Sequence, residues 1–99
     1  MSLPFEIESG ELRSVCERYG VVRLELFGSV LRDDFGPDSD VDVLVEFRPE
    51  AQLGFRFLEL ERELSGVLGN RRVDLVRSRY LNPRLRKIVQ GSTRTLYAA

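Results

Sequence analysis

The sequence predicts an α+β fold in which a small mixed β-sheet of three to four strands is flanked by helices. Apolar residues recur at helical spacing in residues 9–19 and again in residues 53–68. Short apolar runs follow these stretches at residues 22–27, 40–47 and 72–76, and their composition is typical of strands. A chain of 99 residues can bury one core. We therefore expect residues 1–99 to form a single domain.

The first half of the chain is expected to contain a helix, a strand and a short turn. Ser9 is a candidate cap for a helix that Gly20 ends. The apolar positions of this helix are Leu12, Val15, Cys16 and Tyr19. A strand over residues 22–27 should follow, and Gly28 and Ser29 should break it before a helical turn and a polar loop over residues 33–39.

The second half continues the alternation with a strand at residues 40–47. Its second helix has apolar positions at Leu53, Phe57, Leu60, Leu64 and Leu68. We expect Glu59, Glu61 and Glu63 of this helix to face solvent. A third strand should cover residues 72–76 and a last helix residues 82–90, while residues 95–97 could add an edge strand.

Charge is distributed unevenly along a chain whose net charge is only −1. Residues 1–70 carry seven Arg against fifteen Asp or Glu, whereas residues 71–99 carry seven Arg and one Lys against one Asp. The basic end leaves a nucleic-acid-binding module open as an alternative. Basic residues at helical spacing are more often a solvated face, so we expect no nucleic-acid partner.

Several classes of function are excluded by what the sequence lacks. There is no His, and the lone Cys16 lies on the apolar side of the first helix. Zinc sites and Cys-His or Ser-His catalysis are therefore excluded. No apolar run approaches the roughly 20 residues needed to span a membrane, and the start of the chain does not resemble a signal peptide. We expect a cytoplasmic protein with no membrane partner.

Two aspartates at the start of the second strand are the strongest functional signal. Side chains alternate in a strand, so Asp40 and Asp42 project to one side while Val41, Val43 and Val45 fill the other. Carboxylates crowded in this way repel each other unless a cation neutralises them. An oxygen-preferring ion such as Mg²⁺ is the natural explanation.

Asp74 stands between Val73 and Leu75 in the third strand, where an unpaired carboxylate would be costly. One interpretation is an ion pair with Arg71, Arg72 or Arg77. If the second and third strands are neighbours, Asp74 instead faces the same way as Asp40 and Asp42. These carboxylates would then form a cluster of the kind that holds metal.

Other interpretations of the aspartates fail on spacing. An EF-hand needs Gly and Glu where this chain has Val43 and Pro49. A P-loop needs a lysine beside its glycines, and the only lysine is Lys87, far from Gly28. Glycosidase carboxylates face each other across a cleft rather than standing two residues apart on a strand. Metal-assisted phosphoryl or nucleotidyl transfer remains.

The spacing of Gly28-Ser29, Asp40-Val41-Asp42 and Asp74 resembles that of the minimal nucleotidyltransferases of the DNA polymerase beta superfamily. The similarity covers about residues 22–76, and small members of the family have the length of this chain. Asp33 departs from the commonest form of the motif, in which Gly often follows the position of Arg32. The resemblance implies a polymerase-beta-like nucleotidyltransferase fold and a nucleotidyltransferase activity.

The resemblance also implies roles for individual residues. Asp40 and Asp42 would bind two Mg²⁺ ions, and Asp74 would complete the site or act as a base. The backbone after Gly28 and the Ser29 hydroxyl would bind phosphates of ATP, because unpaired N–H groups favour anions. Arg32 could contact a phosphate, although a salt bridge to Asp33 or Asp34 is an alternative.

The acceptor is inferred from the resemblance and from the length of the chain. Small family members are similar to antitoxins whose partner is a helical HEPN ribonuclease, so we expect transfer of AMP from ATP to a hydroxyl of such a protein. The acidic residues would suit a basic partner. A catalytically silent binding antitoxin stays open as an alternative, and association of the chain with itself is compatible with the sequence.

Overall fold

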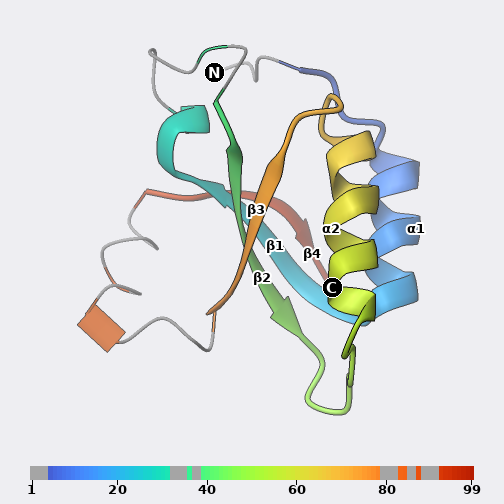
Figure 1. Cartoon of the computed structure of the whole chain (residues 1–99). Coiled ribbons are helices and arrows are strands. Elements are labelled where there is room, and N and C mark those ends of the chain that lie inside the picture. The colour runs from blue at the N-terminus through green and yellow to red at the C-terminus, as the bar shows by residue number, and fades with distance from the viewer. Residues whose placement is uncertain (1–4, 32–35, 37–38, 79–82, 85–86, 88–91) are drawn as a thin grey trace.

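The computed structural model describes residues 5–31, 36, 39–78, 83, 84, 87 and 92–99 (Figure 1). Its elements alternate along the chain as the sequence predicts. In order they are α1 (Ser9–Tyr19), β1 (Val21–Phe27), the short 3-10 helix η1 (Gly28–Leu31), β2 (Val41–Phe47), α2 (Arg56–Val67), β3 (Val73–Arg77) and β4 (Arg94–Ala98). The predicted α+β class with a mixed sheet is confirmed.

The four strands form one sheet in the order β3-β2-β1-β4. β1 runs antiparallel to both of its neighbours, β2 and β4, whereas β2 and β3 are parallel. The parallel connection passes through α2, as a crossover between parallel strands requires. Residues 95–97, expected to add an edge strand or to fray, lie within β4 at the edge beside β1.

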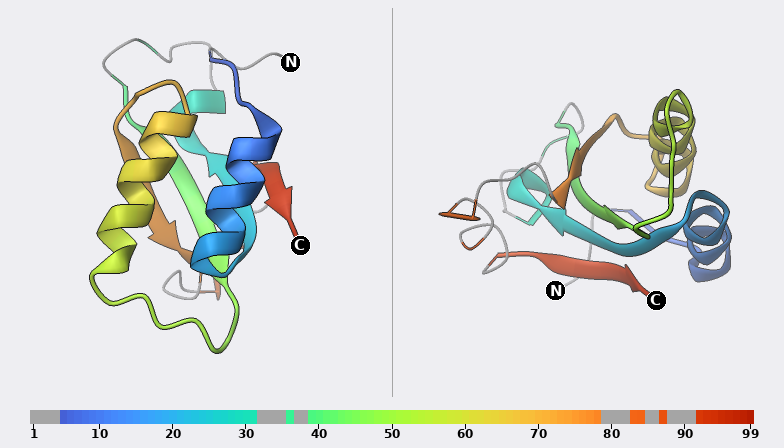
Figure 2. Two further views of the ribbon diagram at one scale, coloured as in Figure 1. Left: turned by 90° about the vertical axis from the view of Figure 1, so that its right-hand side faces the viewer. Right: turned by 90° about the horizontal axis from the view of Figure 1, so that it is seen from below.

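Both helices cover the same face of the sheet (Figure 2). The core between them is built from alternate strand residues and from the apolar stripes of the helices. Leu24, Val43 and Leu64 are fully buried there. Cys16 is also fully buried, and its burial, with the nearby charge of Glu17, raises the pKa of the thiol to about 12.

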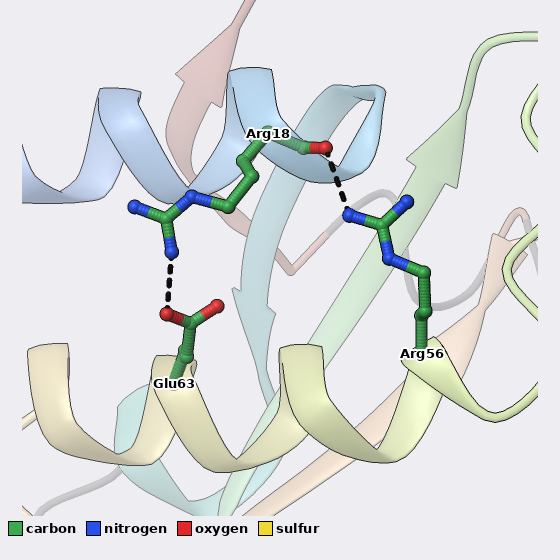
Figure 3. A network of polar contacts seen from close by, with 3 residues as sticks. All are labelled: Arg18, Arg56 and Glu63. Carbon is green, nitrogen blue, oxygen red and sulfur yellow. Dashed lines mark hydrogen bonds and ion pairs between the residues drawn. The ribbon is translucent and has the colours of Figure 1, made fainter.

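Polar contacts join the two helices at their surface (Figure 3). Arg18 Nη1 lies 2.6 Å from Glu63 Oε1, and Arg56 Nη2 donates a hydrogen bond of 3.4 Å to the Arg18 carbonyl. Glu63 therefore faces α1 rather than only solvent, which corrects the expectation for this residue. Hydrogen bonding to this carboxylate, followed by burial, raises the pKa of Tyr19 above its ordinary value.

The start of α1 differs from the prediction. Glu8, not Ser9, caps the helix, because its longer side chain accepts hydrogen bonds from the N–H groups of Gly10 and Glu11 at 3.0 and 2.6 Å. Gly20 ends the helix with a φ of 72°, as expected. Most of the loop expected at residues 33–39 and of the helix expected at residues 82–90 lies outside the described residues. Among the helices that are described, none is long and apolar enough to cross a membrane.

Candidate active site

The site predicted from the sequence lies at one end of the sheet, where β2 and β3 begin and where η1 follows β1 (Figure 1). Asp42 is the second residue of β2, and Asp74 is the second residue of β3. The two are register partners across the parallel pair. Partners in neighbouring strands point to the same face, so both carboxylates project from the face of the sheet opposite α1 and α2, called the open face below.

Alternation along β2 separates the core from this site. Val41, Val43 and Val45 are at most 1% exposed and face the helices. Asp42 lies on the opposite face and is only partly buried. The local sequence therefore anchors the strand through its valines and holds the carboxylate at a defined position on the open face.

Gly28 connects β1 to this site through a backbone conformation with a φ of 76°. A Cβ atom built at Gly28 would lie 3.2 Å from Asp42 Cγ and closer still to Asp42 Oδ2. A side chain at position 28 would thus need a strained backbone and would collide with the carboxylate. Glycine is needed here both for the turn and for the approach of Asp42.

The residues after Gly28 form η1, which Val30 anchors with 4% exposure. Ser29 is the second residue of this turn and directly follows Gly28, whose Cβ position lies against Asp42. The side chain of Ser29 and all of Arg32 lie outside the described part of the structure. Their predicted contacts with phosphate stay predictions.

Asp40 precedes β2, and its Oδ1 lies 4.0 Å from Nε of Arg72. The backbone beside this pair is joined by a hydrogen bond of 2.8 Å from Val41 N to the Arg72 carbonyl. Both side chains are exposed, at 46% for Asp40 and 84% for Arg72. The pair is therefore an open ion pair at the rim of the site, and water screens its attraction.

Asp74 forms no ion pair with a described arginine. Arg72 is drawn to Asp40, Arg71 donates to the Gly36 carbonyl at 3.0 Å, and Arg77 stacks on the rings of Phe47 and Phe57. The ion pair described between an arginine and an aspartate of this site therefore involves Asp40, and the role of Asp74 stays a prediction. Asp74 is exposed on the open face beside Asp42.

These three aspartates provide oxygen ligands of the kind that Mg²⁺ prefers. The backbone arrangement fits such a cation, because Asp42 and Asp74 share a register position and Asp40 stands two residues before Asp42. Within the described ranges, however, no three carboxylates come close enough to hold a metal ion as their side chains stand. Binding would require these side chains to change rotamer on a backbone that already places them together.

Glu25 is a site feature that the sequence analysis missed. It lies two residues before Phe27, the partner of Asp42, and so occupies the same face of the sheet. It is only 5% exposed and forms an ion pair with Arg23. The signal in the sequence was a Glu between Leu24 and Leu26, in a strand where a charge is costly unless paired.

A separate cavity of about 200 Å³ lies at the other end of β2 and β3. Phe47, Arg48, Arg77 and Ser78 are among its lining residues. Phe47 is five residues along β2 from Asp42, a separation of about 17 Å in a strand. This cavity is therefore not part of the carboxylate site.

Comparison with known proteins agrees with the geometry. A model of the family described as "Nucleotidyltransferase domain" matches residues 11–96. The chain belongs to this family. It is 41% identical over 87 residues to the protein adenylyltransferase MntA of Thermococcus cleftensis, a match that covers 85% of this chain and 86% of that protein. The chain is therefore an enzyme of the nucleotidyltransferase class, and the resemblance to minimal nucleotidyltransferases is confirmed.

Solved structures show the same fold. A minimal nucleotidyltransferase with 40% sequence identity superposes with a TM-score of 0.72, covering 87% of this chain and 86% of that one. A toxin–antitoxin complex solved with AMP-PNP superposes with a TM-score of 0.69 at 22% identity, covering 94% of this nucleotidyltransferase and 75% of its match. The second likeness supports the fold alone.

Proposed function

We propose that this nucleotidyltransferase transfers AMP from ATP to a hydroxyl group of a protein partner of the HEPN family and thereby acts as its antitoxin. The observation that carries the proposal is the register of Asp42 with Asp74 on the open face of the sheet, beside the glycine turn at Gly28. Such a face offers carboxylates to a metal, and Asp40 and Asp74 are exposed there to an acceptor.

The proposal gives each of these residues a role. Asp40 and Asp42 would hold two Mg²⁺ ions, and Asp74 would complete the site or accept the proton of the attacking hydroxyl. When bound, the ions would lower the pKa of that hydroxyl and neutralise charge on the phosphates. The hydroxyl oxygen forms a bond to the α-phosphorus while the bond to the β-phosphate oxygen breaks and pyrophosphate leaves.

The glycine turn would bind the triphosphate. Without a side chain at Gly28, a phosphate can approach the backbone N–H groups that follow it, and Ser29 would add a hydroxyl donor. Arg32 would contact a phosphate oxygen from the same segment. In this proposal the nucleotide would lie between η1 and the aspartates of β2.

The choice of AMP and of the acceptor rests on the relatives. One is the protein adenylyltransferase MntA, and a Shewanella oneidensis complex with the same fold contains a tri-AMPylated HEPN toxin and an MNT antitoxin. Residues 1–70 of the present chain are strongly acidic, and this charge would attract a basic ribonuclease. Asp74 is exposed, so a hydroxyl group on the surface of another protein could reach it.

Intact-mass spectrometry of a HEPN protein from the same genome tests the proposal. The purified partner would be incubated with this protein, ATP and Mg²⁺, with Asp42→Asn as the matched inactive control. We expect the partner to gain the mass of one or more AMP groups only with the wild-type protein. A stable complex without any gain in mass would instead indicate a binding-only antitoxin and would overturn the catalytic proposal.

A further inference from the structure

The open face carries a fourth charged residue that extends the carboxylate site. Val41 and Val73 are register partners, so the residues before them, Asp40 and Arg72, stand side by side at the entry to the sheet. Asp40 shares a face with Asp42, and Arg72 shares a face with Asp74. The site therefore consists of two neighbouring pairs of residues. Asp42 lies beside Asp74 in one pair, and Asp40 lies beside Arg72 in the other.

The backbone of Arg72 is hydrogen-bonded, while its side chain is exposed. Its carbonyl accepts a hydrogen bond of 2.8 Å from Val41 N, which ties the residue to the start of β2. Its side chain is 84% exposed and approaches Asp40 at 4.0 Å without closer contact. An exposed ion pair of this kind contributes little to folding, so stability alone gives no strong reason for an arginine at this position.

A cation at the carboxylates would compete with Arg72 for Asp40. Once Asp40 binds a divalent ion, its carboxylate attracts the Arg72 guanidinium less strongly. The guanidinium would then lie at the rim of the site without this ion-pair partner. A nucleotide brings phosphate oxygens to the same place. Guanidinium binds phosphate with charge-assisted and often bidentate hydrogen bonds, which exceed a single screened contact with a carboxylate.

We propose that Arg72 binds the phosphates of the nucleotide. Its side chain would exchange its contact with Asp40 for one with the triphosphate when the nucleotide binds together with its divalent ion. The inference rests on the proposed function, because it uses the same site and the same donor. It adds Arg72, on the loop between α2 and β3, to the nucleotide-binding surface. Arg72 and η1 would then contact the phosphates from the two sides of β2.

A competing role would be that Arg72 only positions Asp40. The two roles predict opposite effects on the metal. If Arg72 binds phosphate, its removal frees Asp40 from a competing cation, and a divalent ion alone should bind equally well or more tightly. If Arg72 positions Asp40, its removal should weaken binding of the divalent ion itself.

Isothermal titration calorimetry with AMP-PNP and Mg²⁺ on the wild-type protein, Arg72→Ala and Arg72→Lys tests the proposal. Binding of Mn²⁺ alone would be followed by the loss of its free electron paramagnetic resonance signal. Arg62→Ala is the matched control, because Arg62 is exposed on α2 and its replacement removes the same charge. Inorganic tripolyphosphate with Mg²⁺ would show whether an effect concerns the phosphates rather than the base.

We expect Arg72→Ala to weaken the binding of AMP-PNP and of tripolyphosphate by about tenfold. The affinity of Arg72→Lys should lie between those of Arg72→Ala and the wild-type protein. Binding of Mn²⁺ should be unchanged or about two- to fivefold tighter. Affinities of Arg72→Ala equal to those of Arg62→Ala would overturn the inference and leave the proposed function standing. A parallel loss of Mn²⁺ affinity would assign Arg72 to positioning instead, and failure of the wild-type protein to bind AMP-PNP would overturn both proposals.

Discussion

The two faces of the central strand β2 show how one short segment serves stability on one side and chemistry on the other. Val41, Val43 and Val45 are buried against the helices, whereas Asp42 points to the open face beside Asp74. Neighbouring residues thus differ in role although only about 3.3 Å of strand separates them. Substitutions of the valines on the helix side should change folding, and substitutions of Asp42 and Asp74 on the open side should change binding and transfer.

The largest effect on stability is expected from the helix side. Leu64 is fully buried in α2, and Leu64→Ala should lower the free energy of unfolding by about 3 kcal/mol by removing apolar contacts and leaving a cavity. Urea denaturation followed by circular dichroism measures the change. Leu58 of the same helix is 60% exposed, so Leu58→Ala is the matched control and should be nearly neutral. Equal losses for the two variants would contradict the assigned core.

Gly28 lies where the two roles meet, so its replacement should affect both. Gly28→Ala places a methyl group against the Asp42 carboxylate in a backbone region unfavourable to alanine. We expect a loss of about 1–2 kcal/mol of stability together with weaker AMP-PNP binding. Gly66→Ala in α2 is the control, because nothing lies within 4 Å of its added Cβ atom. A Gly28→Ala protein that binds AMP-PNP normally would show that the turn does not shape the site.

A smaller effect is expected at the polar contact between the helices. Arg18 and Glu63 are 52% and 36% exposed in their side chains, so solvent screens the pair (Figure 3). Arg18→Ala should cost less than about 1 kcal/mol of stability. A thermodynamic double-mutant cycle with Glu63→Gln measures the coupling. A coupling well above this value would mean that the pair is more shielded than its exposure indicates.

The smallest effect on stability should come from Asp74. Asp74→Ala removes a repulsive charge beside Asp42 and breaks no described ion pair, so the ligand-free protein should melt at the same temperature or slightly higher. The rise in melting temperature caused by AMP-PNP with Mg²⁺ should shrink. Glu59→Ala, on the exposed side of α2, should leave that rise intact. A destabilised Asp74→Ala protein with a full rise would assign Asp74 a structural role.

The sequence predicted the features that depend on local pattern. Alternation in residues 40–47 predicted that Val41, Val43 and Val45 face the core, although Leu44 on the side of Asp42 is buried as well, and Gly28 predicted the break after β1. The register of Asp42 with Asp74 was predicted only on the condition that β2 and β3 are neighbours, because pairing between distant segments is not encoded in a local pattern.

The features that the sequence did not predict depend on tertiary contacts. Arg72 pairs with Asp40 rather than Asp74, beside the backbone hydrogen bond from Val41 N to the Arg72 carbonyl. Glu25 is buried only because its strand lies between β2 and β4. Glu8 replaces Ser9 as the helix cap because its side chain reaches two N–H groups of the first turn. None of these contacts follows from residue type or spacing alone.

The measurement that tests the account most directly compares two neighbours on β2. Asp42→Asn and Val43→Ala would each be assayed for AMP transfer to the HEPN partner and for free energy of unfolding. We predict that Asp42→Asn loses transfer with unchanged stability, while Val43→Ala loses about 2 kcal/mol of stability but keeps its transfer rate per folded molecule. Transfer by a folded Asp42→Asn protein, or its loss in a folded Val43→Ala protein, would contradict the division of roles between the two faces.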